Sequence, residues 1–230
     1  MGAVYLVRHG QASFGQADYD KLSDKGRKQS EILGEHFKKL VTPDRFYSGN
    51  LLRHEQTADH FLTGFGDSSL PMITHSGFNE FNHVEVLVRY KPEWKDYKVM
   101  AVDLAKNPIP KKAFESAFLA AVKRWISGGH DHEYEESWTQ FQQRCSSALK
   151  EVITQSSEAK NIVIFTSGGP ISAITQEILK LADRETFSVN SVLANTGVSK
   201  LLFSKDRLSV SYLNNYVHLE LAGSGWVTYR

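Results

Sequence analysis

Short apolar runs alternate along this chain with longer segments in which apolar residues recur at helical spacing. Short runs rich in β-branched and aromatic residues predict buried β-strands, and the longer period predicts amphipathic helices. The expected strands cover residues 4–7, 45–48, 162–166, 198–203 and 208–213, and the expected helices cover residues 23–40, 51–61, 137–154 and 169–181. Because strands and helices alternate, we expect a three-layer α/β/α fold with a mostly parallel central sheet.

The alternation is interrupted between Glu80 and about residue 129. This stretch carries Trp94, several tyrosines and prolines and two expected helices, but no expected strand. We expect a helical insertion at residues 81–136, packed over the carboxyl edge of the sheet, within a single domain that covers residues 1–230. Its aromatic residues are expected to form core and not a ligand cage.

Composition narrows the class of protein. Hydrophobic residues make up 41% of the 230 residues, which is ample for a core. Lys and Arg total 27 and Asp and Glu total 26, so the sequence lacks the excess of positive charge that is typical of nucleic-acid-binding proteins. No apolar run approaches the roughly 20 residues that cross a bilayer, and the chain opens on a strand instead of a leader. With its single cysteine, Cys145, the sequence predicts a cytoplasmic protein that binds neither nucleic acid nor membrane.

The triplet Arg8-His9-Gly10 directly follows the first apolar run. Ligands of open α/β sheets bind at the carboxyl ends of the strands, where these three residues are expected to lie. Glycine allows close approach of the backbone, arginine offers a planar fork for phosphate or carboxylate, and neutral histidine acts as base, nucleophile or ligand. The triplet therefore indicates chemistry on an anion.

Further segments follow this triplet in a characteristic order. They are Leu22–Ser30 (LSDKGRKQS), Leu52–Ala58 (LRHEQTA) after the second strand, Phe78–Phe81 (FNEF), and Ser167–Pro170 (SGGP) after the run at 162–166. Together with Arg8-His9-Gly10, this order resembles the histidine phosphatase (phosphoglycerate mutase-like) superfamily. The resemblance covers residues 4 to about 175.

The resemblance implies a metal-independent phosphomonoester hydrolase without a cofactor. In its terms His9 is the nucleophile that forms a phosphohistidine, Arg8 and Arg53 grip the phosphate oxygens, and Glu80 protonates the leaving group. Ser167 and Gly168 then contact the phosphate at the N-terminus of the helix that follows them. The expected substrate is a phosphorylated small molecule or a phosphoprotein. The segment after Glu80 does not resemble that of the phosphoglycerate mutases, so mutase activity is not expected.

One position departs from the family pattern. Ser167 stands where the family usually places a second histidine before the glycine. Either His54 or His83 could supply an imidazole instead, or Ser167 could simply cap the following helix. The alternative function is therefore a phosphoryl-binding or interaction domain that has lost useful turnover. The segment His130–Glu133 is rich in ligand-type residues, but its spacing is not that of a zinc site, and we expect a solvated loop.

Overall fold

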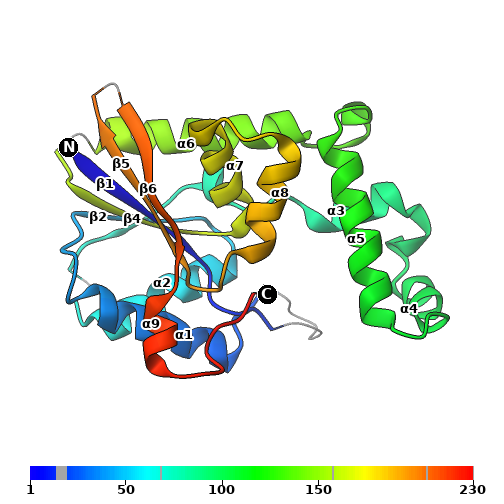
Figure 1. Cartoon of the computed structure of the whole chain (residues 1–230), viewed down its shortest axis with the longest axis horizontal. Helices are drawn as coiled ribbons and strands as arrows, with labels where there is room; N and C mark the ends of the chain where they lie inside the picture. Colours follow the sequence, from blue (N-terminus) through cyan, green and yellow to red (C-terminus); the bar gives the residue numbers. More distant parts are fainter. Residues whose placement is uncertain (14–19, 68, 157, 206, 230) are drawn as a thin grey trace. The chain divides into compact units, whose positions relative to one another are not determined.

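The computed structural model describes residues 1–13, 20–67, 69–156, 158–205 and 207–229, which form two compact units (Figure 1). One unit combines residues 1–80 with residues 144–230, and the other comprises residues 81–143. The first unit contains a six-stranded sheet with the order β3-β2-β4-β1-β5-β6. Its strands are β1 (Gly2–Arg8), β2 (Arg45–Ser48), β3 (Met72–Thr74), β4 (Asn161–Thr166), β5 (Val198–Ser204) and β6 (Arg207–Asn215).

Strand direction reverses twice across this sheet, so that β5 alone runs opposite to the other five strands. The pairs β3–β2, β2–β4 and β4–β1 are parallel, whereas β1–β5 and β5–β6 are antiparallel. The first four strands therefore end at the same edge, where the segments after β1, β2 and β4 meet. The predicted α/β fold with a mostly parallel sheet is confirmed.

Helices cover both faces of the sheet (Figure 1). On one face lie α1 (Asp24–Phe37), α2 (Leu52–Phe65) and α9 (Val217–Ala222), and on the other lie α7 (Gly168–Leu179) and the part of α6 (Trp138–Gln155) that belongs to this unit. The helix α8 (Asp183–Val192) packs against α7, and the short turn η1 (Ser76–Phe78) follows β3.

Alternate residues of the central strands pack on opposite faces of the sheet. Tyr5 and Val7 of β1 and Phe165 of β4 belong to the core beneath α1 and α2. Phe61 of α2 is fully buried there, with its ring centroid 5.1 Å from that of Phe165 and 5.5 Å from that of Phe37. Because the strand residues between these are also buried, the central strands are apolar throughout, which made them visible in the sequence.

The ends of several elements differ from the expected ranges. The first helix ends at Phe37 and not at residue 40, because Leu40 turns toward solvent and is 65% exposed. The helix α2 continues to Phe65 and ends at Gly66, whose φ of 77° lies in the left-handed region that glycine adopts readily. Ser23 accepts a hydrogen bond from the Gly26 N–H, which confirms the expected N-cap.

The elements β3, α8 and α9 were not predicted. The strand β3 is a short edge strand, and α8 buries only Thr186 within its helical span. Neither β3 nor α8 therefore shows the apolar periodicity from which strands and helices are recognised.

The second unit is helical. Its elements are α3 (His83–Tyr90), η2 (Pro92–Lys95), α4 (Tyr97–Ala105), α5 (Pro110–Ile126), η3 (Asp131–Glu133) and the first part of α6. Trp125 is buried at its centre, and the ring centroids of Phe81, Trp138 and Phe141 lie 4.8, 5.2 and 5.6 Å from that of Trp125. Of the aromatic residues of the insertion, Phe81, Trp94 and Trp125 are buried as expected, whereas Tyr90 and Tyr97 are 40% and 74% exposed and do not form core.

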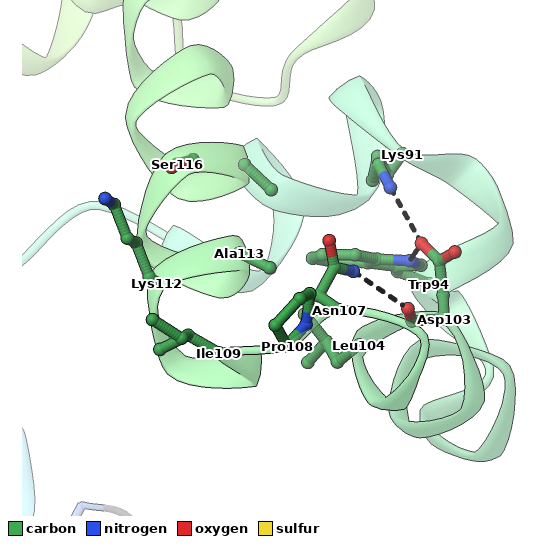
Figure 2. A pocket seen from close by; sticks show the side chains of 11 residues that line it. Lys91, Trp94, Asp103, Leu104, Asn107, Pro108, Ile109, Lys112, Ala113 and Ser116 are labelled. Atoms are coloured by element: carbon green, nitrogen blue, oxygen red, sulfur yellow. Dashed lines mark hydrogen bonds and ion pairs between the residues drawn. The ribbon is translucent and has the colours of Figure 1, made fainter.

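A surface pocket of about 470 Å³ lies between α4 and α5 (Figure 2). Asp103 accepts hydrogen bonds from Lys91 Nζ at 2.8 Å and from Trp94 Nε1 at 3.0 Å. The Lys91 ammonium also lies 4.2 Å from the centre of the Trp94 ring. The polar groups at this wall are thus engaged with one another.

Thr196 joins the turn before β5 to the end of β1. Its backbone N–H donates to the carbonyl oxygens of Arg8 and His9 at 3.0 and 3.3 Å. Its φ of 55° is unusual for a β-branched residue, so these bonds stabilise a strained backbone. The Thr196 Oγ1 atom lies 2.9 Å from Nε2 of the buried His218 in α9. His218 therefore supports the turn that holds Arg8 and His9.

We expect acid pH to destabilise the fold through His218. Burial, and to a smaller extent His36, lowers the pKa of His218 to about 3. The unfolded chain binds this proton near pH 6.5, so the stabilisation is fully present above that pH and is lost as the pH falls. His218→Gln should remove up to about 1.4 kcal/mol per pH unit from the pH dependence of the unfolding free energy. Urea denaturation between pH 7 and 4 measures this.

The matched control for this experiment is His132→Gln, because His132 is exposed. That variant should keep the pH dependence of the parent. An equal pH dependence in the parent and in His218→Gln would contradict the prediction.

Candidate functional site

His9 lies at the carboxyl end of β1, where three segments hold its backbone. Its N–H donates to the Thr166 carbonyl of β4 at 2.8 Å, and its own carbonyl accepts from the Asn195 side chain at 3.1 Å. The next N–H, of Gly10, donates to Thr57 Oγ1 of α2 at 3.0 Å. The sheet and α2 thus fix the position from which the His9 ring projects.

The His9 ring is neutral and has a defined tautomer. Its Nδ1 atom lies 2.8 Å from the Gly10 carbonyl oxygen, which can only accept, so Nδ1 carries the proton. Burial lowers the pKa of His9 well below its usual range, and the charges of Arg53 and Arg8 lower it further. The side chain is 7% exposed. At neutral pH the Nε2 atom therefore carries a lone pair, as a nucleophile requires.

Arg8 and Arg53 both lie close enough to His9 to affect its charge. Arg8 donates to the carbonyl oxygens of Leu193 and Tyr229, the latter at 3.2 Å. Arg53, at the start of α2, is 6% exposed and forms an ion pair with Asp20. Both guanidinium groups thus disfavour the charged form of the His9 imidazole.

Asp20 connects Arg53 to the start of α2. Its Oδ2 atom accepts a hydrogen bond from the Leu52 N–H at 2.8 Å, while Oδ1 binds the Arg53 guanidinium. The Asp20 carboxylate is therefore bound to Arg53, the arginine to which the resemblance assigns phosphate binding.

The N-terminus of α7 lies at the same edge of the sheet. A Cβ atom at Gly168 would lie 2.3 Å from Asn190 Oδ1 and 3.7 Å from Arg8 Nε, so a side chain there would require the Asn190 amide to move. The Gly169 N–H donates to Glu80 Oε2 at 3.2 Å. Glu80 and Gly168 are therefore brought together at a helix N-terminus, where backbone amides favour anions.

Ser167 does not cap α7 with its side chain. It occupies the N-cap position with an extended backbone, but its hydroxyl makes no capping hydrogen bond. Its Oγ atom instead lies 2.6 Å from Nε2 of His54. The interpretation of Ser167 as a side-chain helix cap is therefore wrong.

His54, the residue after Arg53, is fully buried in α2. Its ring centroid lies 5.9 Å from that of His9. Burial lowers the pKa of His54 well below its usual range, and Arg53 adds to this, so the ring is neutral at pH 7. Of the two histidines considered as a replacement imidazole, His54 belongs to the same unit as His9, whereas His83 begins α3 in the second unit.

The ligand-type residues His130–Glu133 take part in an ion-pair cluster within the second unit. Arg124 Nη2 binds both carboxylate oxygens of Glu133 at 2.6 and 2.7 Å, and His130 Nδ1 lies 2.9 Å from Oε1. Among the described residues, no three His, Cys, Asp or Glu side chains are grouped so that they could hold a metal ion. The described part of the chain also contains no helix with the length and apolar character needed to cross a membrane.

Sequence reasoning missed several residues that contact this site. Asp20 binds Arg53, Asn195 holds the His9 carbonyl, and Asn190 packs against Gly168. Asn195 belongs to an Asn-Thr-Gly turn before a strand, which was a usable signal. Asp20 and Asn190 lie in polar segments without a comparable signal.

Comparison with known proteins identifies the family of this chain. The chain matches the family model of the histidine phosphatase superfamily (branch 1) over residues 4–216. A 2,3-bisphosphoglycerate-dependent phosphoglycerate mutase of Bartonella tribocorum is 34% identical over 88 residues, or 35% of this chain. The chain spans 42% of the length of this curated relative.

Solved structures share the whole fold. A phosphoglycerate mutase of Bacillus anthracis has a TM-score of 0.64 and 17% identity, with 94% of each chain covered. A phosphoserine phosphatase of Entamoeba histolytica has a TM-score of 0.66 and 18% identity, covering 95% of this chain and 100% of that one. At these identities the likeness establishes the fold. Since the family model also matches nearly the whole sequence, the chain belongs to the histidine phosphatase superfamily, in which its relatives are phosphatases and mutases.

Proposed function

We propose that the protein is a metal-independent phosphomonoester hydrolase that acts through a phosphohistidine on His9. The observation that carries this proposal is the tautomer of His9, whose Nδ1–H is bound to the Gly10 carbonyl. That bond leaves Nε2 as a nucleophile beside two arginines and a helix N-terminus. The substrate class is a phosphorylated small molecule or a phosphoprotein, with no nucleic acid or membrane partner and a cytoplasmic location.

The reaction proceeds in two steps. In the first, Nε2 of His9 forms a bond to phosphorus, the bond from phosphorus to the ester oxygen breaks, and Glu80 gives its proton to that oxygen. In the second, water attacks phosphorus, the nitrogen–phosphorus bond breaks, and Glu80 takes up the proton of the water. The products are the alcohol and inorganic phosphate, and both side chains return to their starting forms.

Arg8, Arg53 and the start of α7 stabilise the charge on the nonbridging oxygens of the phosphoryl group. Phosphoryl transfer depends mainly on positioning and on such electrostatic stabilisation. Arginine is suited to this task because its planar fork binds two oxygens at once. Ser167 and Gly168 contribute uncharged donors at the helix N-terminus.

A second candidate is a phosphoryl-binding domain with little turnover. The observation that favours it is Ser167, which brings a hydroxyl and no charge to the position next to Gly168. Both candidates bind phosphate, and only the hydrolase forms a covalent phosphoenzyme. Mutase activity is not proposed, because the segment after Glu80 lacks the sequence typical of the mutases.

We expect His9→Ala to abolish hydrolysis while phosphate binding is partly retained, since Arg8, Arg53 and the α7 N-terminus remain. The assay uses an aryl phosphate with EDTA present, together with detection of acid-labile phosphate on the protein. The parent should form the phosphoenzyme and the variant should not. Hydrolysis by the variant within about tenfold of the parent, a difference of only about 1.4 kcal/mol in barrier, would refute the role of His9. Loss of activity in EDTA would refute metal independence.

We expect Glu80→Gln to slow alkyl phosphates by at least about a hundredfold more than aryl phosphates. An alkoxide needs a proton as it leaves, whereas a phenolate leaves readily without one. The measurement is the ratio of kcat/KM values for the two substrates in parent and variant. Equal losses on both substrates would show that Glu80 does not act as the acid.

We expect Asp20→Asn to bind inorganic phosphate more tightly, by roughly tenfold, because Arg53 no longer has a competing carboxylate. The same change should lower the melting temperature, since a buried guanidinium loses its ion-pair partner. Isothermal titration and thermal unfolding test the two effects. Asp24→Asn is the matched control, because its carboxylate is fully exposed and lies 3.6 Å from Arg27. Unchanged or weaker phosphate binding by Asp20→Asn would contradict the expectation.

A further inference from the structure

His54 and Ser167 form a buried pair at the candidate site. The His54 Nε2 atom and the Ser167 Oγ atom are 2.6 Å apart, and both residues are 0% exposed. They come from α2 and from the start of α7, the two elements that also supply Arg53 and Gly168. The pair therefore belongs to the same edge of the sheet as His9.

We propose that His54 orients the Ser167 hydroxyl, through a hydrogen bond from Nε2–H to Oγ, so that this hydroxyl donates its proton to a phosphate oxygen at His9. Ser167 is then a catalytic residue that touches the phosphate, and His54 is a positioning residue that acts through it. This inference rests on the proposed function, because it requires the phosphate to bind beside His9.

The first support is a count of hydrogen-bond donors. A neutral imidazole has one N–H and a serine has one O–H, yet the two side chains share a single hydrogen bond. No other partner of either side chain is present among the described residues, and Nδ1 of His54 is buried without one. One donor of the pair is therefore left over. Buried donors without an acceptor are rare in native proteins, so this surplus proton is available to an oxygen that enters the site.

The surroundings of Nδ1 decide which donor is left over. A Cβ atom at Gly49 would lie 2.3 Å from Nδ1, so this side of the ring packs directly against backbone and has no room for a ligand. A proton on Nδ1 would be orphaned permanently, whereas a proton on Nε2 is bound by Ser167. The tautomer of His54 with its proton on Nε2 is therefore favoured. The remaining donor is the Ser167 O–H.

The position of Ser167 in the fold supports donation of its hydroxyl proton to a phosphate at His9. It precedes Gly168, where a Cβ atom would lie 3.7 Å from Arg8 Nε, and Gly169, whose N–H donates to Glu80. Full burial of Ser167 does not exclude contact with phosphate, because His9 itself is only 7% exposed.

The opposite arrangement would make Ser167 a nucleophile with His54 as its base. A base of this kind needs a group that orients it through Nδ1, as a carboxylate does in serine hydrolases. Nδ1 of His54 has no such partner in the described part of the chain. This arrangement is therefore an outcome that the test must be able to detect.

The test is a set of kinetic variants in the full-length protein. Ser167→Ala should lower kcat by roughly a hundredfold, as loss of one preorganised donor does, with little change in KM. His54→Phe fills the same space without an N–H and should cause a similar loss of kcat. His54→Gln keeps an N–H near the Nε2 position and should recover most of it. In the double variant with Ser167→Ala and His54→Phe, kcat should be no lower than in Ser167→Ala alone.

His60→Phe is the matched control, because His60 is a partly exposed histidine of α2 that pairs with Glu31. It should keep the kcat of the parent. A kcat for His54→Phe within about twofold of the parent would overturn the inference. The inference would also be overturned if the kcat losses of Ser167→Ala and His54→Phe multiplied in the double variant.

Two further measurements keep the result decisive if His54→Phe fails to fold. Nitrogen chemical shifts of the histidine rings in the parent should show the Nε2–H tautomer for His54, and an Nδ1–H tautomer would overturn the inference. The phosphoenzyme should carry phosphate on His9, and phosphate on Ser167 would establish the serine as the nucleophile.

If His9→Ala stays active, the proposed function fails. If His9→Ala is inactive while His54→Phe and Ser167→Ala are normal, only the present inference fails.

Discussion

The geometry of the site depends on how the backbone is held where β1 ends. The Arg8 N–H donates to the Gly197 carbonyl at 3.1 Å and the His9 N–H donates to that of Thr166 at 2.8 Å, so strands on both sides of β1 define the path of the chain. The Gly10 N–H then donates to Thr57 in α2. Because the peptide groups here are bonded in three directions, the position of His9 is fixed by β4, by α2 and by the turn before β5.

A buried polar network extends this support to the C-terminal segment. Gln29 of α1 is fully buried, its Oε1 accepts from the Gln11 N–H at 2.9 Å, and its Nε2 donates to Thr228 Oγ1 at 2.9 Å. Thr228 donates to Asn195 Oδ1 at 2.8 Å, and Asn195 donates to the His9 carbonyl. Every member has a partner, so the network specifies one arrangement of segments that are far apart in the sequence. A change in the C-terminal segment can thus affect the hydrogen bond that holds the His9 carbonyl.

The sequence predicted the central strands and the helices that pack on them, because β1 and β4 are buried on both faces and α1 has a clear apolar stripe. It also singled out Arg53 and Ser167 as candidate site residues. It did not predict that His54 contacts Ser167, which lies 113 positions away. That contact follows from the parallel pairing of β2 and β4, in which Ser48 lies opposite Phe165. Strand order and register therefore decided which of the two candidate histidines meets the serine, and neither can be read from spacing.

The charge balance of the site couples binding to proton transfer. His9 and His54 are neutral, so among the described site residues the positive charge comes from Arg8 and Arg53, and Asp20 and Glu80 are available to balance it. In the proposed reaction a phosphate dianion enters beside Glu80, which favours the protonated form of that carboxyl group. A protonated Glu80 is the form that can donate to a leaving oxygen. Substrate binding would thus prepare the acid. In the proposed arrangement, the neutral Ser167 hydroxyl oriented by His54 would stabilise the phosphate without opposing that proton uptake, as a further cation would.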